Sequence, residues 1–158
     1  MAQVSTRSVA LPNVEAADHE RPHGREPRRG AILVIEDRYD VRQGMAQLLE
    51  LHGFLVVDAA NAEEALVHLA TDPRGFALIL LDLMMPGPLS GSEFRARQLA
   101  SPELADIPTL VVSATVPDGT ARTELHPEAW IEKPFRFDHL LTIVKQYVTP
   151  EAGAMIAE

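Results

Sequence analysis

Residues 76–82 read Phe-Ala-Leu-Ile-Leu-Leu-Asp, and this stretch indicates the fold more clearly than any other in the chain. Six apolar residues in a row are typical of a strand that is buried on both faces of a parallel sheet. The run ends in a carboxylate, Asp82, and a turn-rich segment with Pro86 and Gly87 follows. A structural role alone explains such a carboxylate poorly, so Asp82 is a candidate for chemistry.

Short apolar runs alternate with amphipathic stretches on both sides of this segment. Strands are predicted at 31–35, 54–58, 76–81, 107–112 and 129–132, with helices between them and a last helical period over 137–148. Five alternations of strand and helix predict right-handed crossovers. The expected fold class is therefore α/β, with a parallel sheet and helices on both of its faces.

Capping residues mark the ends of two helices. The first helix is predicted to begin at an N-cap, Asp40, with Gln43 three residues later, and to end at Gly53. The second helix is predicted to begin at Asn61, with Glu64 at the position of a capping box.

The third and fourth helices have weaker patterns. After Gly91 the apolar stripe is interrupted by Arg95 and Gln98. The fourth helix must fit into residues 117–125, which contain a glycine and precede Pro127. We expect it to be short, marginal or mobile.

Length, composition and net charge exclude several classes of protein. A chain of 158 residues with 46% hydrophobic residues fits one domain, and the absence of cysteine excludes disulfides and thiolate metal sites. The formal net charge of −9 argues against a general nucleic-acid binder. No apolar run has the length of a membrane span, so we expect a cytoplasmic protein without membrane contact. Residues 1–30 are interpreted as a flexible leader and residues 149–158 as a short tail.

Charged residues follow two further predicted strands. Glu36 and Asp37 come after the first strand, and Lys133 comes after the last. Because the carboxyl ends of parallel strands lie at one edge of the sheet, these residues and Asp82 should form one site. Clustered carboxylates repel one another unless a cation lies among them, and an all-oxygen donor set favours Mg²⁺, or Mn²⁺, over zinc.

This combination supports phosphoryl transfer. The carboxylate of Asp82 could attack phosphorus, while the metal and Lys133 offset the charge of the transferring group. Ser113, at the end of the fourth strand, could donate a hydrogen bond to a phosphoryl oxygen, as could the backbone N–H groups that follow it.

Four motifs together resemble the receiver domain of two-component response regulators. They lie at residues 34–37, 81–87, 111–114 and 132–135, in the order that the family has them. The resemblance covers about residues 31–148, which we take as the receiver domain. It implies a flavodoxin-like, doubly wound sheet of five parallel strands in the order 2-1-3-4-5.

The resemblance also implies the roles of the acidic residues. Asp82 would be the phosphoacceptor, and the phosphoryl group would come from a sensor histidine kinase or a histidine phosphotransfer protein. Asp37 and Asp82 would bind Mg²⁺ directly, the backbone carbonyl of Met84 would complete the protein ligands, and Glu36 would bind through water.

Three further side chains have implied roles. Lys133 would pair with Asp82 and then with the phosphoryl group, Ser113 would swing towards that group, and Trp130 would stand at the position of an aromatic switch. Backbone N–H groups would bind the phosphoryl oxygens at Leu83, Met84 and Ala114.

Three departures from the family pattern affect what can be expected. The loop 82–91 looks one residue longer than usual, and the segment 113–133 looks a couple of residues shorter. Trp130 is larger than the usual aromatic, so a packed core residue and a moving switch both stay open. The side chains of Met84 and Thr115 carry neither a carboxylate nor an amide, which predicts a slow loss of phosphate.

The favoured function is a single-domain response regulator whose phosphorylation switches protein–protein binding, without direct nucleic-acid binding. Its downstream protein target is unknown, and a homodimer is left open. One alternative is a receiver-like adaptor that no longer switches. A metal-dependent phosphatase with an aspartate nucleophile is less favoured, because such enzymes usually carry a second aspartate where this chain has Met84. A flavin carrier is weaker still, because acids follow the first strand.

Overall fold

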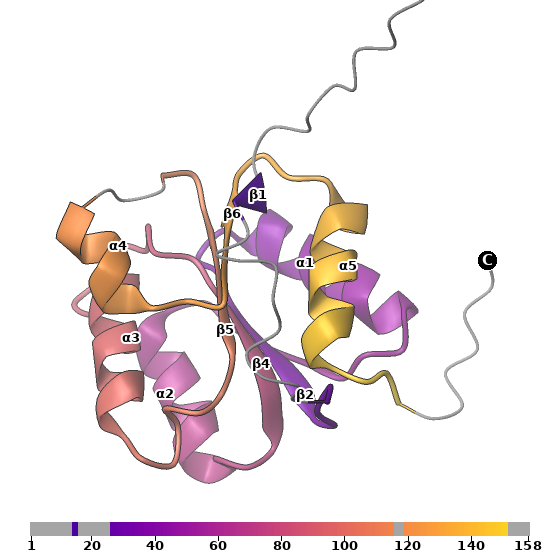
Figure 1. The fold of residues 1–158 in the computed structure, drawn as a ribbon, viewed down its shortest axis with the longest axis horizontal. Coiled ribbons are helices and arrows are strands. Elements are labelled where there is room, and N and C mark those ends of the chain that lie inside the picture. Colours follow the sequence, from indigo (N-terminus) through magenta and orange to yellow (C-terminus); the bar gives the residue numbers. More distant parts are fainter. Residues whose placement is uncertain (1–13, 16–25, 116–118, 152–158) are drawn as a thin grey trace, which may run out of the picture.

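The computed structural model describes residues 14–15, 26–115 and 119–151, and it has helices on both faces of a central sheet (Figure 1). In this part of the chain the strands are β1 (Val14–Glu15), β2 (Ala31–Ile35), β3 (Val56–Ala59), β4 (Phe76–Leu81), β5 (Thr109–Ser113) and β6 (Ala129–Glu132). The helices are α1 (Tyr39–Leu51), α2 (Ala62–Thr71), α3 (Gly91–Ala100), α4 (Gly119–Leu125) and α5 (Phe137–Tyr147).

The sheet has the order β1-β6-β5-β4-β2-β3. Strands β2 to β6 are parallel to one another, so the five predicted strands have the order 2-1-3-4-5 and the expected fold class is confirmed. The sequence did not predict β1, which lies within the expected leader and pairs antiparallel with β6. The rest of that leader up to residue 25, and the tail from residue 152, lie outside the described residues.

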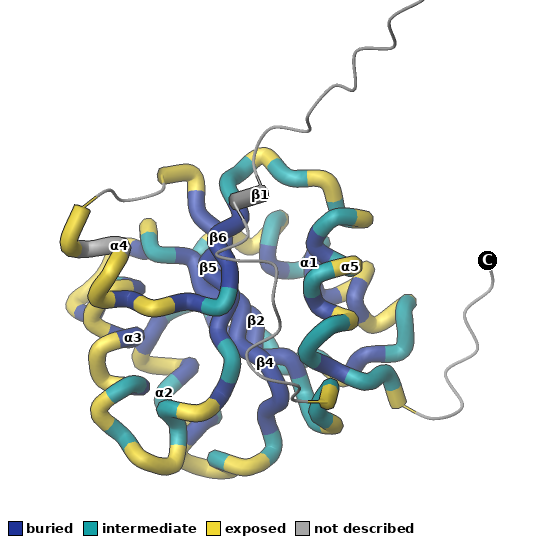
Figure 2. The backbone as a smooth tube through the Cα atoms, in the orientation of Figure 1, coloured by how far each residue is buried: buried dark blue, intermediate teal, exposed yellow. Residues whose placement is uncertain are grey.

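The core lies in two layers, one on each face of the sheet. Figure 2 shows β2, β4, β5 and β6 as largely buried, whereas the exposed positions lie mainly on the outer sides of the helices and in the loops. Alternate residues of β4 serve the two layers: Leu78 and Leu80 pack towards α1 and α5, whereas Ile79 and Leu81 pack towards α2 and α3. This double burial explains why β4 is an uninterrupted apolar run.

Two strand boundaries differ from the prediction. The strand predicted at 54–58 is β3 at Val56–Ala59, and Phe54 is a buried core residue that precedes it. The strand predicted at 107–112 begins only at Thr109. Proline has no N–H to donate to a strand ladder, so Pro108 contributes only its carbonyl oxygen, which accepts from Ile79 N at 2.9 Å.

The predicted helix ends are partly correct. The N-cap at Asp40 is wrong: α1 begins at Tyr39 after an extended Arg38 that makes no side-chain cap, and Asp40 lies in the first turn. Gly53 does follow the end of α1, with a φ of 86° that favours glycine. Asn61 caps α2 as predicted, because its side chain accepts from Glu64 N at 2.8 Å.

The two weak patterns have different outcomes. Helix α4 is short as expected, with 7 residues, and it ends before His126, which has a φ of 39°. In α3, the residues that interrupt the apolar stripe are buried: Arg95 is 3% exposed and Gln98 is 0% exposed. They belong to a buried polar network rather than to a solvent-facing side of the helix.

Candidate functional site

Three carboxylates meet at the carboxyl edge of the sheet. Glu36 and Asp37 follow β2, Asp82 follows β4, and these strands are neighbours with Ile35 opposite Leu81. The main chain continues the pairing one step further, since Asp82 N donates to Ile35 O at 3.0 Å. Oxygen atoms of the three carboxylates lie within 4.8 Å of one another. The structure therefore brings together the three acids that the sequence predicted to meet.

Lys133 reaches the same cluster from the end of β6. Its Nζ lies 2.5 Å from Oε2 of Glu36 and 3.4 Å from Oδ2 of Asp82. The backbone N of Lys133 also donates to Ser113 O at 2.9 Å, which fixes its strand end against that of β5. Lys133 is thus shared by two acids, with the shorter contact to Glu36 rather than to Asp82.

The electrostatics of the cluster favour an additional cation. Burial raises the pKa of the Glu36 carboxyl above its ordinary value. The bond from Lys133 opposes this rise, the charge of Asp82 adds to it, and the backbone N–H of Arg38 opposes it weakly. Three carboxylates against one ammonium leave negative charge uncompensated. The all-oxygen donors and this excess charge fit a hard divalent cation such as Mg²⁺.

The turn after Asp82 is held at both of its ends. Met84 N donates to Oδ1 of Asp82 at 3.0 Å, and the Met84 side chain is exposed. At the other end, a Cβ on Gly91 would stand 2.6 Å from the carbonyl oxygen of Asp82, so only glycine fits this close approach. The roles expected for the Met84 carbonyl and for the N–H groups of Leu83 and Ala114 stay predictions.

Ser113 has an unsatisfied buried hydroxyl. It ends β5, which lies between β4 and β6, and it is 1% exposed. Its Oγ has no hydrogen-bond partner within the described part of the chain. An unsatisfied buried polar group is costly, so this hydroxyl is suited to donate to an oxygen of a bound group.

Trp130 lies on the neighbouring strand, three residues before Lys133. It is 3% exposed and shares a small apolar cluster with Val111 and Leu125, against which the half-buried Leu83 packs. The indole is therefore a packed residue that connects α4 with the turn after Asp82. The expected role of Trp130 as a switch stays a prediction.

Arg42 is a residue of this region that the sequence interpretation missed. It is buried on α1, and Nη1 donates to the carbonyl oxygens of Glu36 at 2.9 Å and Asp37 at 3.4 Å. A signal was present in the sequence, because Arg42 stands three residues before Met45 on the apolar stripe of the first helix. An arginine at a stripe position is usually paired when it is buried.

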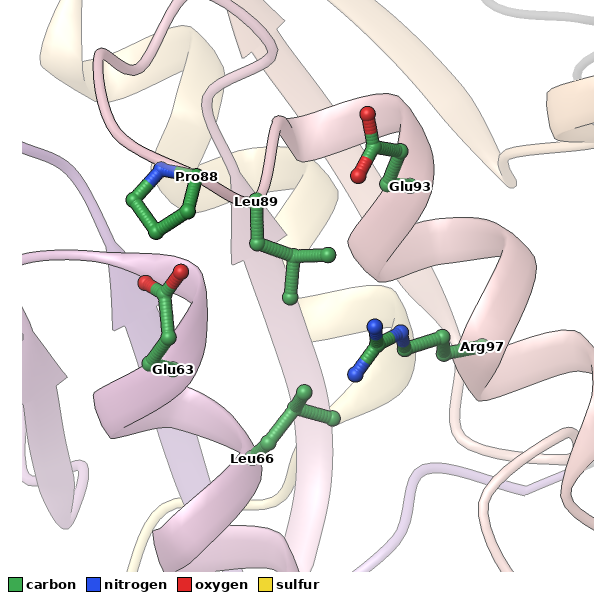
Figure 3. Close-up of a pocket in the computed structure, with 6 residues that line it drawn as sticks. All are labelled: Glu63, Leu66, Pro88, Leu89, Glu93 and Arg97. Carbon is green, nitrogen blue, oxygen red and sulfur yellow. The ribbon is translucent and has the colours of Figure 1, made fainter.

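A separate hollow lies between α2 and α3, with a volume of about 320 Å³. Figure 3 shows Leu66 of α2 and Leu89 of the loop pointing into it, with the guanidinium of Arg97 beside them. Glu63, Pro88 and Glu93 complete its lining, and none of the acids of the cluster takes part.

Known proteins resemble the chain in sequence and in structure. The family model of the response regulator receiver domain matches residues 32–145. The uncharacterized transcriptional regulatory protein YkoG of Bacillus subtilis is 29% identical over 117 residues, which are 74% of this chain and 50% of YkoG.

Two solved structures are similar in fold. A response regulator receiver protein from Pseudomonas putida has a TM-score of 0.67 at 28% identity, covering 74% of this chain and 96% of the other. The response regulator protein TrrA from Thermotoga maritima, in complex with Mg(2+)-BeF, has a TM-score of 0.63 at 26% identity, covering 73% of this chain and 96% of the other.

The first curated relatives are longer proteins, of which the chain spans between 24% and 53%. None of the helices in the described part of the chain combines the length and the apolar character that a membrane span requires. The fold, the cluster of acids with its lysine, and the family match over residues 32–145 agree. The chain therefore belongs to the response regulator receiver domain family.

Proposed function

We propose that the chain accepts a phosphoryl group on Asp82 in a Mg²⁺-dependent reaction, and that this modification switches its binding to a protein partner. The donor is the phosphohistidine of a sensor histidine kinase or of a histidine phosphotransfer protein. The observation that carries the proposal is the convergence of Asp82 with two acids and Lys133 at one sheet edge. The match to the receiver family and the magnesium and beryllofluoride complex of TrrA support it.

The reaction follows from the groups around Asp82. One carboxylate oxygen of Asp82 attacks phosphorus, a P–O bond forms, the P–N bond to the donor histidine breaks, and its electron pair stays on the imidazole nitrogen. Lys133 then pairs with the transferred phosphoryl group instead of the Asp82 carboxylate. The Ser113 hydroxyl, which has no partner in the described chain, donates to a phosphoryl oxygen. Asp37, Asp82, the Met84 carbonyl and, through water, Glu36 would hold Mg²⁺, which would supply positive charge to offset that of the phosphoryl oxygens.

Phosphorylation is proposed to act by changing a contact between the receiver domain, residues 31–148, and a protein partner. The acidic charge of the chain and its site chemistry support a cytoplasmic signalling module rather than direct binding of nucleic acid. The exposed Met84 side chain has no group that could orient an attacking water, which supports slow loss of the phosphoryl group and disfavours a phosphatase.

The proposal is tested by adding Mg²⁺ and then a small phosphodonor while Trp130 fluorescence is followed. We expect the wild-type signal to respond to both additions, and intact-protein mass spectrometry to find one phosphoryl adduct. Asp82→Asn should abolish the adduct, because the amide lacks the nucleophilic oxygen.

Asp106→Asn, the same change at an exposed aspartate, is the control and should behave as wild type. Mg²⁺ binding without any adduct on the wild-type chain would instead support a receiver that has lost switching. Steady turnover of phosphoester substrates would support an enzyme.

A further inference from the structure

Arg42 is a buried arginine beside the acidic cluster that the proposed phosphoryl chemistry does not use. It lies in the first half of α1 and is 8% exposed. Its Nη1 group donates to the main-chain carbonyl oxygens of Glu36 at 2.9 Å and of Asp37 at 3.4 Å. Both of these residues also contribute carboxylates to the cluster.

Other contacts hold the same guanidinium from β3 and from its own helix. Nε donates to Oδ2 of Asp58 on β3 at 2.9 Å, and the amide of Gln43 donates to the same oxygen at 3.2 Å. Cζ of Arg42 lies 5.5 Å from the centre of the Tyr39 ring, within the range of a cation–π contact. Because the planar guanidinium has fixed donor directions, these contacts define its orientation.

The packing of α1 alone does not require an arginine at this position. Arg42 occupies a stripe position where an apolar side chain would pack without the cost of desolvating a charge. The groups that offset this cost belong mainly to the loop between β2 and α1 and to β3. A single side chain thus ties the loop that carries Glu36 and Asp37 to the neighbouring strand.

We infer that Arg42 is a positioning residue of the magnesium site, which fixes the main chain of residues 36 and 37 so that their carboxylates meet Asp82. Rotation of either peptide would turn the attached carboxylate away from the cluster, and the bonds to Glu36 O and Asp37 O oppose that rotation. The inference rests on the proposed function, because it concerns the same metal site.

Positioning and charge predict opposite effects when Arg42 is removed. A positive charge near the site repels Mg²⁺, so loss of the charge alone would tighten binding. Loss of the hydrogen bonds to the loop would weaken binding, as is usual when an outer partner of metal ligands is removed. The direction of the change therefore separates the two roles.

The test compares Mg²⁺ affinity in Arg42→Met and Arg42→Lys with that of the wild-type chain. We expect the Kd of Arg42→Met to rise by about 10-fold or more, and that of Arg42→Lys, which keeps the charge but loses the planar fork, to rise less. Affinity is measured by Trp130 fluorescence and, independently, by the Mg²⁺-dependent rise of the thermal midpoint.

Arg136→Gln is the matched control, because it removes one positive charge from an exposed arginine whose side chain pairs with Asp138 at 3.2 Å. Its Kd should stay within about twofold of wild type. A folded Arg42→Met protein with unchanged or tighter Mg²⁺ binding overturns the inference. If Arg42→Met does not fold, Asp58→Ala replaces it, and an unchanged Kd there overturns the inference equally.

The proposed function and the inference fail in different ways. A wild-type chain that does not respond to Mg²⁺ overturns both, because no metal site then exists to be positioned. A wild-type chain that binds Mg²⁺, together with an Arg42→Met variant of equal affinity, overturns the positioning role alone and leaves the phosphoacceptor proposal standing.

Discussion

Glu36 has the least favourable environment for a charge among the residues of the acidic cluster. It is fully buried, and burial together with the nearby Asp82 raises its pKa despite the bond from Lys133. A carboxyl whose pKa is raised in the folded state lowers stability whenever it is ionised. The arrangement that suits a divalent cation therefore weakens the metal-free fold.

Glu36→Gln should consequently stabilise the metal-free protein. At pH 7 in chelator we expect the free energy of unfolding to rise, by an amount of order 1 kcal/mol, while Lys133 keeps Asp82 as its partner. Because the folded-state pKa is raised, the gain should be absent below the ordinary pKa of glutamate and grow as the pH rises through the folded-state value. Urea denaturation at several pH values measures it.

In Mg²⁺ the order should reverse, since the variant loses part of the proposed metal site and so part of the stabilisation that bound metal would give. Glu103→Gln, at an exposed position, is the control and should change little under either condition. A variant that is less stable than wild type in chelator would show that the bond to Lys133 outweighs burial and repulsion.

At the residue scale, the sequence could predict the members of the site that lie at strand ends. Parallel strands bring their carboxyl ends to one edge, so Glu36, Asp37, Asp82 and Lys133 could be placed together before any distance was known. The sequence did not predict Arg42 as part of the site, because its partners are main-chain carbonyls and Asp58, which no sequence periodicity connects with it.

At the scale of single elements, a buried polar network holds helix α3 in place. The guanidinium of Arg95 donates to the carbonyl oxygens of Leu125 at 2.8 Å and His126 at 2.9 Å, and to Thr109 at 2.9 Å. Gln98 accepts a further bond from Arg95 at 2.7 Å. The network joins α3 to β5 and to the end of α4, and burial lowers the pKa of Arg95.

Arg95→Ala should therefore be strongly destabilising. It would leave buried carbonyl and hydroxyl groups without their donor and open a cavity, so we expect a loss of about 3 kcal/mol in the free energy of unfolding. Arg97→Ala, at an exposed position of the same helix, should cost less than about 0.5 kcal/mol. Urea denaturation measures both, and equal effects would contradict a specific role of the network.

The same network explains why the sequence pattern of α3 is weak. Arginine and glutamine interrupt an apolar period, and the period does not show that their polar groups find partners inside. The partners of Arg95 come from residues about 30 positions later in the chain. A short α4 could be predicted from its glycine and proline, but its attachment to α3 could not.

At the scale of the whole molecule, the alternation of elements was enough to predict the five parallel strands and their layers. The sixth strand was not predictable, because Val14–Glu15 is a short segment in a polar leader. Its pairing with Trp130 and Ile131 covers the edge of β6, which an unpaired strand would otherwise expose to other chains.

Removal of residues 1–25 tests this edge pairing. We expect the shortened chain to fold, since only two residues pair, with a change in the free energy of unfolding of about 1 kcal/mol or less. Backbone amides of β6 should exchange their hydrogens faster, whereas those of β4 at the centre of the sheet should not. Unchanged exchange in β6 would show that β1 gives its edge no protection in solution.

Two distant segments of the described domain meet at the amino ends of the strands, on the side of the sheet opposite the acids. Arg28 N donates to Tyr147 O at 2.8 Å, and Thr149 N donates to Arg28 O at 2.8 Å, so the segment before β2 and the segment after α5 run side by side. Neighbouring ends of this kind permit circular permutation and grafting into a surface loop of a host protein. A graft through residues 28 and 149 would leave the acids facing away from the host, so the receiver domain could be transplanted with its acidic cluster accessible.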